Sequence, residues 1–358
     1  MNIRKTIPIL LLAISSLATA VSAQELKWNV GFDFNFDNRE YGDLQIPSQT
    51  LFGARLSPEI GLAWGPRDRH SLMVGVDVVK AFGRDRFCED PELVMYYGYR
   101  SDKFRVSAGI FPRSRMIGEY SQAIFSDSVR FYDNNIEGLL LQYTGKRGFV
   151  EVGIDWDGIY SRNEREKFRI FSSGNYSTGI FTGGYALSVY HFAGSYDIKG
   201  VVDNIIVNPY AGFDMSRRWP LQRARLTAGW LQTMQRDRIS GQKAVHPGGF
   251  QLKLDLRKWN FGIDNTFYTG DGLMPYFPLY GGELYAGERF YQMQGGKCYD
   301  RLEIYYDKLW SSKADVSLHA GFVFHFIAGK MVTQQVVQLK VAIDNDRFTR
   351  KNNKHHKH

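Results

Sequence analysis

Histidine and serine side chains near residue 190 are the first candidates for chemistry, because a paired serine and histidine could cleave an ester bond. His191 and Ser195 lie four residues apart in the segment YHFAGSYD. In an extended strand this spacing separates them by about 13 Å, too far for a direct hydrogen bond. The chain also contains no G-x-S-x-G segment. The pattern predicts that the protein is not an enzyme, and a hydrolase that uses His191 is the weakest alternative.

The other histidines do not predict a metal centre. His319 and His325 fall on one face of an extended segment, but about 20 Å apart, so they cannot share an ion. The histidines of the terminal segment NNKHHKH are typical of a solvated basic end. We therefore predict neither a metal ion nor a cofactor.

The elements that must carry these residues show strict alternation of apolar and polar side chains. In the segment 250–257, Phe and Leu occupy one face, and Gln, Lys, Asp and Arg occupy the other. The same period of two recurs in 28–36, 316–326 and 337–344, and it is typical of β-strands. A soluble antiparallel sheet would also alternate. These segments, however, run about ten residues or more, which favours tilted membrane-spanning strands over globular strands of five or six.

The connections alternate between tight turns and long loops, as in a closed transmembrane barrel with turns on one side and loops on the other. We predict an all-β fold, an antiparallel transmembrane β-barrel of about 16 strands. Glycines between 168 and 190 blur the pairing there, so 14 or 18 strands remain open. The predicted strands are 26–36, 50–63, 70–82, 91–100, 104–113, 135–144, 149–156, 168–176, 183–194, 204–216, 223–237, 248–257, 260–270, 298–310, 315–328 and 333–344.

The start of the chain is typical of an export signal. Arg4 and Lys5 precede an apolar run, and the small residues Val21, Ser22 and Ala23 resemble a cleavage site. We expect residues 1–23 to be a cleaved signal peptide, 24–346 to form the barrel and 347–358 to be a basic periplasmic tail. An even strand number would place both termini in the periplasm.

Charge and cysteine content limit the classes of partner. The formal net charge of +8 is a mild bias toward anions such as lipopolysaccharide, and no basic-aromatic stripe indicates nucleic-acid binding. Cys88 and Cys298 are the two cysteines of the chain. In the predicted topology both lie in or beside long loops, so one disulfide between them is possible.

Three segments, AGIFPRSR, FSDSVRFYDNNIEGLLLQY and YTGDGLMPYFPLYGGELYAGERFY, together with the alternation, resemble porin-like outer-membrane barrels of Gram-negative bacteria, of the Bacteroidota type. The resemblance implies localisation in the outer membrane, contact with its lipid and lipopolysaccharide, and passive diffusion of small hydrophilic solutes, with anions favoured. It also makes a homotrimer possible. The alternative is a plugged or structural barrel that binds a glycan or a surface lipoprotein through its external loops. Barrels of this type often end on an aromatic residue, whereas here Phe348 is followed by TRKNNKHHKH.

The resemblance also implies that the third long loop, about 114–134, folds into the lumen and narrows it. Opposed charges in such a passage would screen solutes by charge. The predicted constriction residues are Arg113, Arg115, Glu119, Asp127, Arg130 and Asp133. Residues predicted to line the lumen are Lys253, Asp255, Arg257, Arg301, Glu303, Asp307 and Lys340. In the longest loop, 271–297, the candidate glycan or partner contacts are Tyr276, Phe277, Tyr280 and Tyr285, for which a lid that packs on itself is the competing interpretation.

Overall fold

The computed structural model describes residues 24–42, 44–89, 91–216, 220–241, 243–292 and 297–345. The predicted signal peptide, the basic tail and Phe348 lie outside these residues. Within them the chain forms sixteen antiparallel strands. They are β1 (Glu25–Glu40), β2 (Gln49–Trp64), β3 (His70–Ala81), β4 (Glu92–Arg100), β5 (Phe104–Pro112), β6 (Asn135–Thr144), β7 (Gly148–Gly158), β8 (Lys167–Thr178), β9 (Phe181–Phe192), β10 (Val202–Asp214), β11 (Arg223–Asp237), β12 (Gly248–Lys258), β13 (Phe261–Gly270), β14 (Cys298–Ser311), β15 (Asp315–Ile327) and β16 (Lys330–Asp344).

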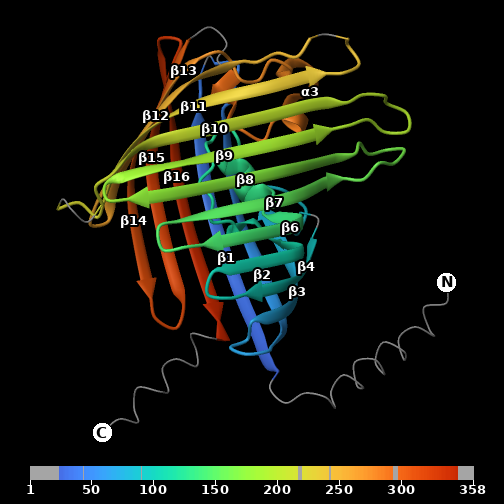
Figure 1. Cartoon of the computed structure of the whole chain (residues 1–358), viewed down its shortest axis with the longest axis vertical. Helices are drawn as coiled ribbons and strands as arrows, with labels where there is room; N and C mark the ends of the chain where they lie inside the picture. The colour runs from blue at the N-terminus through green and yellow to red at the C-terminus, as the bar shows by residue number, and fades with distance from the viewer. Residues whose placement is uncertain are drawn as a thin grey trace.

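The strands close into one barrel, because each pairs with its neighbours in sequence and β1 pairs with β16. Figure 1 shows the strong tilt of the sheet, with β7–β11 crossing the view at a large angle to β14–β16. The predicted fold class is confirmed, and the strand number is 16 rather than 14 or 18. The uncertain region resolves because Thr178 pairs with Phe181 around a two-residue turn whose Gly179 has φ +63°.

Alternation sorts side chains between the outside and the inside of the wall. On β6, for example, Leu139, Leu141 and Tyr143 are exposed outward, whereas Leu140 and Gln142 are buried inside. Outward apolar side chains of this kind suit a lipid-facing wall, where no water is available to polar groups. No helix in the described ranges has the length and apolar character needed to cross a membrane.

The two ends of the barrel differ, and they are named here by their connections. The turn end carries short connections such as 65–69, 101–103, 145–147 and 312–314, together with the first residue of β1 and the last residue of β16. The loop end carries the longer connections 113–134, 159–166, 193–201, 238–247 and 271–297. Short helical segments occur in two of these loops: η2 (Arg113–Arg115), α2 (Asp127–Tyr132), α3 (Phe277–Leu284) and η3 (Arg289–Gln292).

The hydrophobic core lies inside the barrel. Loop residues such as Ile124, Leu284 and Phe290 are almost fully buried there, against wall residues such as Phe171 and Tyr299. The loops 113–134 and 271–292 therefore fold inward, and we call them together the plug. Burial of their apolar side chains inside the wall is what orders them, at roughly 25 cal/mol per Å² of apolar surface.

Candidate functional site

The first half of the plug is anchored to the wall by a buried arginine. Arg113 donates hydrogen bonds to Asp155 of β7 at 2.8 Å and to Asp133 at 2.9 Å. Arg113 and Asp155 are both almost fully buried. Burial alone would lower the pKa of Arg113, but the two carboxylates raise it, so the guanidinium stays charged. The pair fixes the base of the loop to the barrel.

Glu151 of β7 is a second anchor, and the sequence analysis did not identify it as a candidate site residue. Its carboxylate accepts hydrogen bonds from the backbone amides of Ile117 and Gly118 at 2.8 and 2.9 Å, and from the Tyr120 hydroxyl at 2.9 Å. A Cβ added at Gly118 would lie only 2.3 Å from the carboxylate, so the loop approaches this closely because residue 118 is glycine. Contacts between loop and wall residues this far apart in the sequence cannot be recognised from a local sequence pattern.

The predicted constriction residues do lie inside the barrel, in different environments. Glu119 reaches across to β11 and pairs with Arg225 at 2.5 Å. Arg115 donates to the Ser107 hydroxyl and the Tyr96 hydroxyl. Asp127 and Arg130 lie 4.0 Å apart on α2. Their effect on the passage of ions stays a prediction.

The second half of the plug corrects the expectation for the loop aromatics. Tyr276 and Tyr285 are only 7% and 6% exposed, because the loop enters the lumen and packs on the wall. Tyr285 donates to Gln235 at 2.5 Å and Tyr280 to Asp237 at 3.0 Å. Phe277 is partly buried and stacks on Tyr285. Tyr276 and Tyr285 are therefore not free to capture a glycan or lipoprotein outside, and the loop does not merely pack on itself.

The two halves of the plug join each other through backbone hydrogen bonds. The Ser126 amide donates to the Ala286 carbonyl at 2.8 Å, and the Glu288 amide donates to the Gln122 carbonyl at 2.7 Å. Burial raises the pKa of the Glu288 carboxyl to about 6, although the positive charge of Arg39 opposes the shift. The plug is thus one continuous unit with a titratable group at its internal joint.

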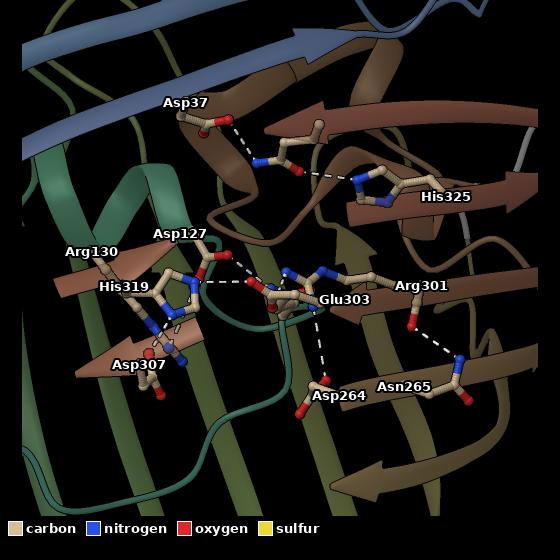
Figure 2. A network of polar contacts seen from close by, with 12 residues as sticks. Asp37, Asp127, Arg130, Asp264, Asn265, Arg301, Glu303, Asp307, His319 and His325 are labelled. Carbon is tan, nitrogen blue, oxygen red and sulfur yellow. Dashed lines mark hydrogen bonds and ion pairs between the residues drawn. The ribbon is translucent and has the colours of Figure 1, made fainter. Parts of the chain in front are cut away.

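The predicted lumen residues of β14 form a connected chain of charges with His319 of β15 (Figure 2). His319 lies between Glu303 and Asp307, at 3.0 and 2.7 Å. Arg301 extends the chain from Glu303, and Arg257 pairs with Asp307 at 3.4 Å. Wall charges on this face therefore neutralise one another.

A second hydrogen-bonded network in Figure 2 links side chains in the loop-end half of the same wall. His325 is linked to Asp37 of β1 through the side chain of Gln334. Its ring also stacks on Phe290 of the plug, with centroids 4.1 Å apart. His319 and His325 thus belong to separate networks, as their spacing predicted. No cluster of metal-ligating side chains occurs in the part of the chain that the structure describes.

Space remains in the lumen around the plug. One cavity of about 570 Å³ is lined by Lys253, Arg257, Glu303 and other wall residues. A larger cavity of about 1040 Å³ extends toward the turn end. Lys340 lines both, whereas Asp255 is paired with Arg223 at 2.5 Å. The wall therefore combines paired charges with open polar space.

A polar group of a different kind lies on the outer wall at the loop end. His191 of β9 faces outward, and its Nδ1 lies 4.0 Å from Asp203 of β10. Arg238 donates two hydrogen bonds to Asp203, at 2.7 and 2.9 Å. His191 also stacks on Phe168. Ser195 is buried and accepts from the Ile198 amide instead, so it does not form a pair with His191.

The two cysteines are both free thiols, so the possible disulfide between Cys88 and Cys298 is not formed. Cys298 lies at the start of β14 and its thiol contacts the Thr269 hydroxyl at 3.4 Å. Cys88 belongs to the loop after β3 and is partly exposed. The topology brings both to the loop end but not into contact.

A closed 16-strand barrel with an apolar exterior and a charged interior defines an outer-membrane barrel of porin-like architecture. Among solved structures, Pseudomonas aeruginosa OpdL is similar to it, at 10% identity over 91% of this chain and 100% of that chain, with a TM-score of 0.50. Two further similar structures are the loop-deleted outer-membrane protein OmpT of Vibrio cholerae (12% identity, 90% and 100% coverage, TM-score 0.49) and Pseudomonas aeruginosa OprD (10%, 89% and 95%, 0.47).

A family model described as lipid A 3'-O-deacylase-type matches residues 19–348, and the chain belongs to this family. A comparison with curated proteins gave no match. The family is one of enzymes, so the prediction that the protein is not an enzyme is wrong. Sequence reasoning missed the enzyme class because it searched for a serine beside a histidine along one strand and for a G-x-S-x-G segment, and neither points to this family.

Proposed function

We propose that this barrel hydrolyses an acyl ester of a lipid A-type glycolipid at the loop-end rim of its outer wall. Membership of the deacylase-type family is the observation that carries the proposal. Such a substrate lies in the membrane beside the barrel, so its ester must be met by side chains on the outward face. His191 and Asp203 lie on that face, next to the loops.

The surroundings of His191 suit a lipid substrate. Phe168 lies between His191 and Trp156, with ring centroids 4.9 and 5.0 Å apart. Trp156 and Met234 are both exposed large apolar side chains of the neighbouring wall. A cavity of about 290 Å³ opens between Asp203, Met234 and Arg238. An acyl chain could lie along the apolar wall while the ester meets the polar group.

The chemistry that these residues offer is general-base hydrolysis. His191 would take a proton from a water molecule as the water oxygen attacks the ester carbonyl carbon. The bond from that carbon to the sugar oxygen then breaks, and the proton returns to the sugar oxygen, which leaves a free fatty acid and a hydroxyl group. Asp203 would orient the imidazole and stabilise its positive charge, and Arg238 holds Asp203 in place. The 4.0 Å between His191 Nδ1 and the Asp203 carboxylate exceeds a hydrogen bond, so the two groups must approach each other during the reaction.

Mass spectrometry of lipid A from vesicles containing the refolded barrel tests this proposal. We expect loss of one acyl chain with the wild type, and a decrease of at least 100-fold in rate for His191→Ala, as general-base loss typically gives. His70→Ala is the matched control, because His70 also stacks on an aromatic ring, Trp64, but at the turn end. Full activity of His191→Ala would contradict the assigned site, and an inactive wild type would contradict the function.

A second candidate function is passive diffusion of small hydrophilic solutes through the lumen, with anions favoured. The cavity of about 1040 Å³ supports it, because Arg115 and Arg130 line this space among an excess of cationic side chains. Current through planar bilayers under a salt gradient tests the idea. Loss of anion preference in an Arg115→Ala, Arg130→Ala double variant is expected, with Arg84→Ala at the loop rim as the control. An unchanged reversal potential would contradict a role for these residues.

Other partners and the orientation are also proposals. We propose that the loop end faces outside and that both termini face the periplasm, since export starts from that side. The homotrimer and the surface lipoprotein partner stay predictions. Any glycan or lipoprotein contact would use exposed loop residues such as Tyr160 and Tyr196, whose ring centroids lie 4.8 Å apart, rather than the buried plug aromatics.

A further inference from the structure

An arginine cluster at the turn end contributes to the cationic lining of the larger cavity, but neither proposed function assigns a bound ligand to it. Arg100, the last residue of β4, and Arg105, near the start of β5, are directly paired across the two strands. The backbone amide of Arg100 also donates to the carbonyl of Arg69, which brings a third arginine to the same place. All three line the turn-end part of the cavity of about 1040 Å³. We call these three residues the arginine cluster.

Directly opposed like charges destabilise a strand pair, because their Cβ atoms lie only about 5 Å apart. Arg105 experiences repulsion from both Arg100 and Arg115. In the described part of the chain, none of the three cluster members has an acidic partner, whereas most lumenal arginines elsewhere do. The repulsion between these arginines therefore destabilises the strand pair, and no carboxylate among the described residues compensates for it.

Two carboxylates that line the same cavity as the cluster are engaged elsewhere. Asp68, next to Arg69 in the chain, pairs with Lys27 at 3.5 Å. Glu59 accepts hydrogen bonds from Tyr96 at 2.8 Å and Asn29 at 3.1 Å. The Tyr96 hydroxyl in turn accepts from Arg115, which ties the fourth arginine of this region to the wall. The guanidinium groups of the cluster are therefore available to bind a ligand from outside the protein.

We infer that the arginine cluster of Arg69, Arg100 and Arg105 binds a water-soluble oxyanion with two or more charges, such as a phosphorylated or polycarboxylated solute, at the turn-end mouth of the lumen. Guanidinium groups match the planar geometry of carboxylates and the oxygens of phosphate through paired hydrogen bonds. A lipid is excluded as the ligand, because the closed wall separates this cavity from the membrane.

The site is independent of ester hydrolysis, because His191 lies on the outward face near the opposite end of the barrel. Calorimetric titration of the refolded full barrel with inorganic tripolyphosphate at low ionic strength tests it. We expect saturable binding by the wild type and at least tenfold weaker binding by the double variant Arg100→Gln, Arg105→Gln. Arg67→Gln is the matched control, because Arg67 lies at the same end, is 80% exposed and does not line the cavity. An equal loss in the control, or no binding by the wild type, would overturn the inference.

Thermal unfolding provides a readout that does not depend on the double variant folding well. Without anion, single Arg105→Gln should unfold at a higher temperature than the wild type, since the repulsion across the strand pair is removed. Tripolyphosphate should raise the unfolding temperature of the wild type and leave that of Arg105→Gln nearly unchanged. Equal stabilisation of both proteins would show that the anion binds somewhere else.

Discussion

The Arg113 guanidinium lies 2.8 Å from the Asp155 carboxylate, and this buried contact fastens the inward loop to the barrel wall. Arg113→Met would leave Asp155 charged and unpaired inside the protein. We expect a loss of about 3–5 kcal/mol in the free energy of unfolding. Urea unfolding followed by tryptophan fluorescence measures it. The double variant Arg113→Met, Asp155→Leu should recover most of the loss, and an unchanged midpoint for Arg113→Met alone would contradict the anchoring role.

The plug is expected to limit the passage of ions, because both of its halves lie inside the wall and bond to each other. Replacement of residues 274–288 by a flexible glycine-serine linker should increase single-channel conductance severalfold. The control is an equivalent replacement of 82–87, a loop-end segment whose Phe87 is exposed. Band migration before and after heating verifies that each barrel is closed. Equal conductance of the plug variant and the wild type would show that these residues do not obstruct the lumen.

Docking of the plug should weaken as the pH rises through about 6. The pKa of Glu288 lies at about 6 in the folded protein, above its ordinary value of 4.5, because of burial. The folded state therefore binds this proton more tightly than the unfolded state does. The stabilising contribution is complete below about pH 4.5 and is lost as the pH rises through 6, on the order of 2 kcal/mol.

Hydrogen exchange of the Ser126 and Glu288 backbone amides measures this effect, because both donate across the joint between the two halves of the plug. Their protection factors, corrected for the intrinsic pH dependence of exchange, should be lower at pH 7.5 than at pH 5. In Glu288→Gln the difference should disappear. Retention of the full pH dependence in that variant would assign it to another group.

The free thiols allow the orientation of the barrel to be tested. Cys88 and Cys298 both lie at the loop end and neither is bridged. A membrane-impermeant maleimide should label both residues in intact cells when the loop end faces outside. Ser312→Cys at the turn end, in a background without the native cysteines, is the control and should label only after the cells are opened. The reverse pattern would place the loops in the periplasm.

Period-two alternation was enough to predict the strands and the faces of the wall, because the side chains of a strand point to opposite sides regardless of distant contacts. Lys253, Arg257 and Glu303 were placed in the lumen on this basis, and the structure puts them around the lumenal cavity. Closure into 16 strands followed from the spacing of turns. The glycine-rich segment around Gly179 needed the tertiary structure to show how β8 and β9 pair.

The contents of the barrel were decided by tertiary structure, because they depend on contacts between residues far apart in the chain. Gln251 bonds to Ser121 across 130 residues, and Arg225 to Glu119 across 106. No local pattern indicates that the loop 271–292 prefers the lumen to solvent, or that Cys88 and Cys298 stay apart. The pairing of His191 with Asp203 likewise exists only because β9 and β10 are neighbours in register. The sequence by itself determined the wall, and packing inside and around that wall determined where chemistry can take place.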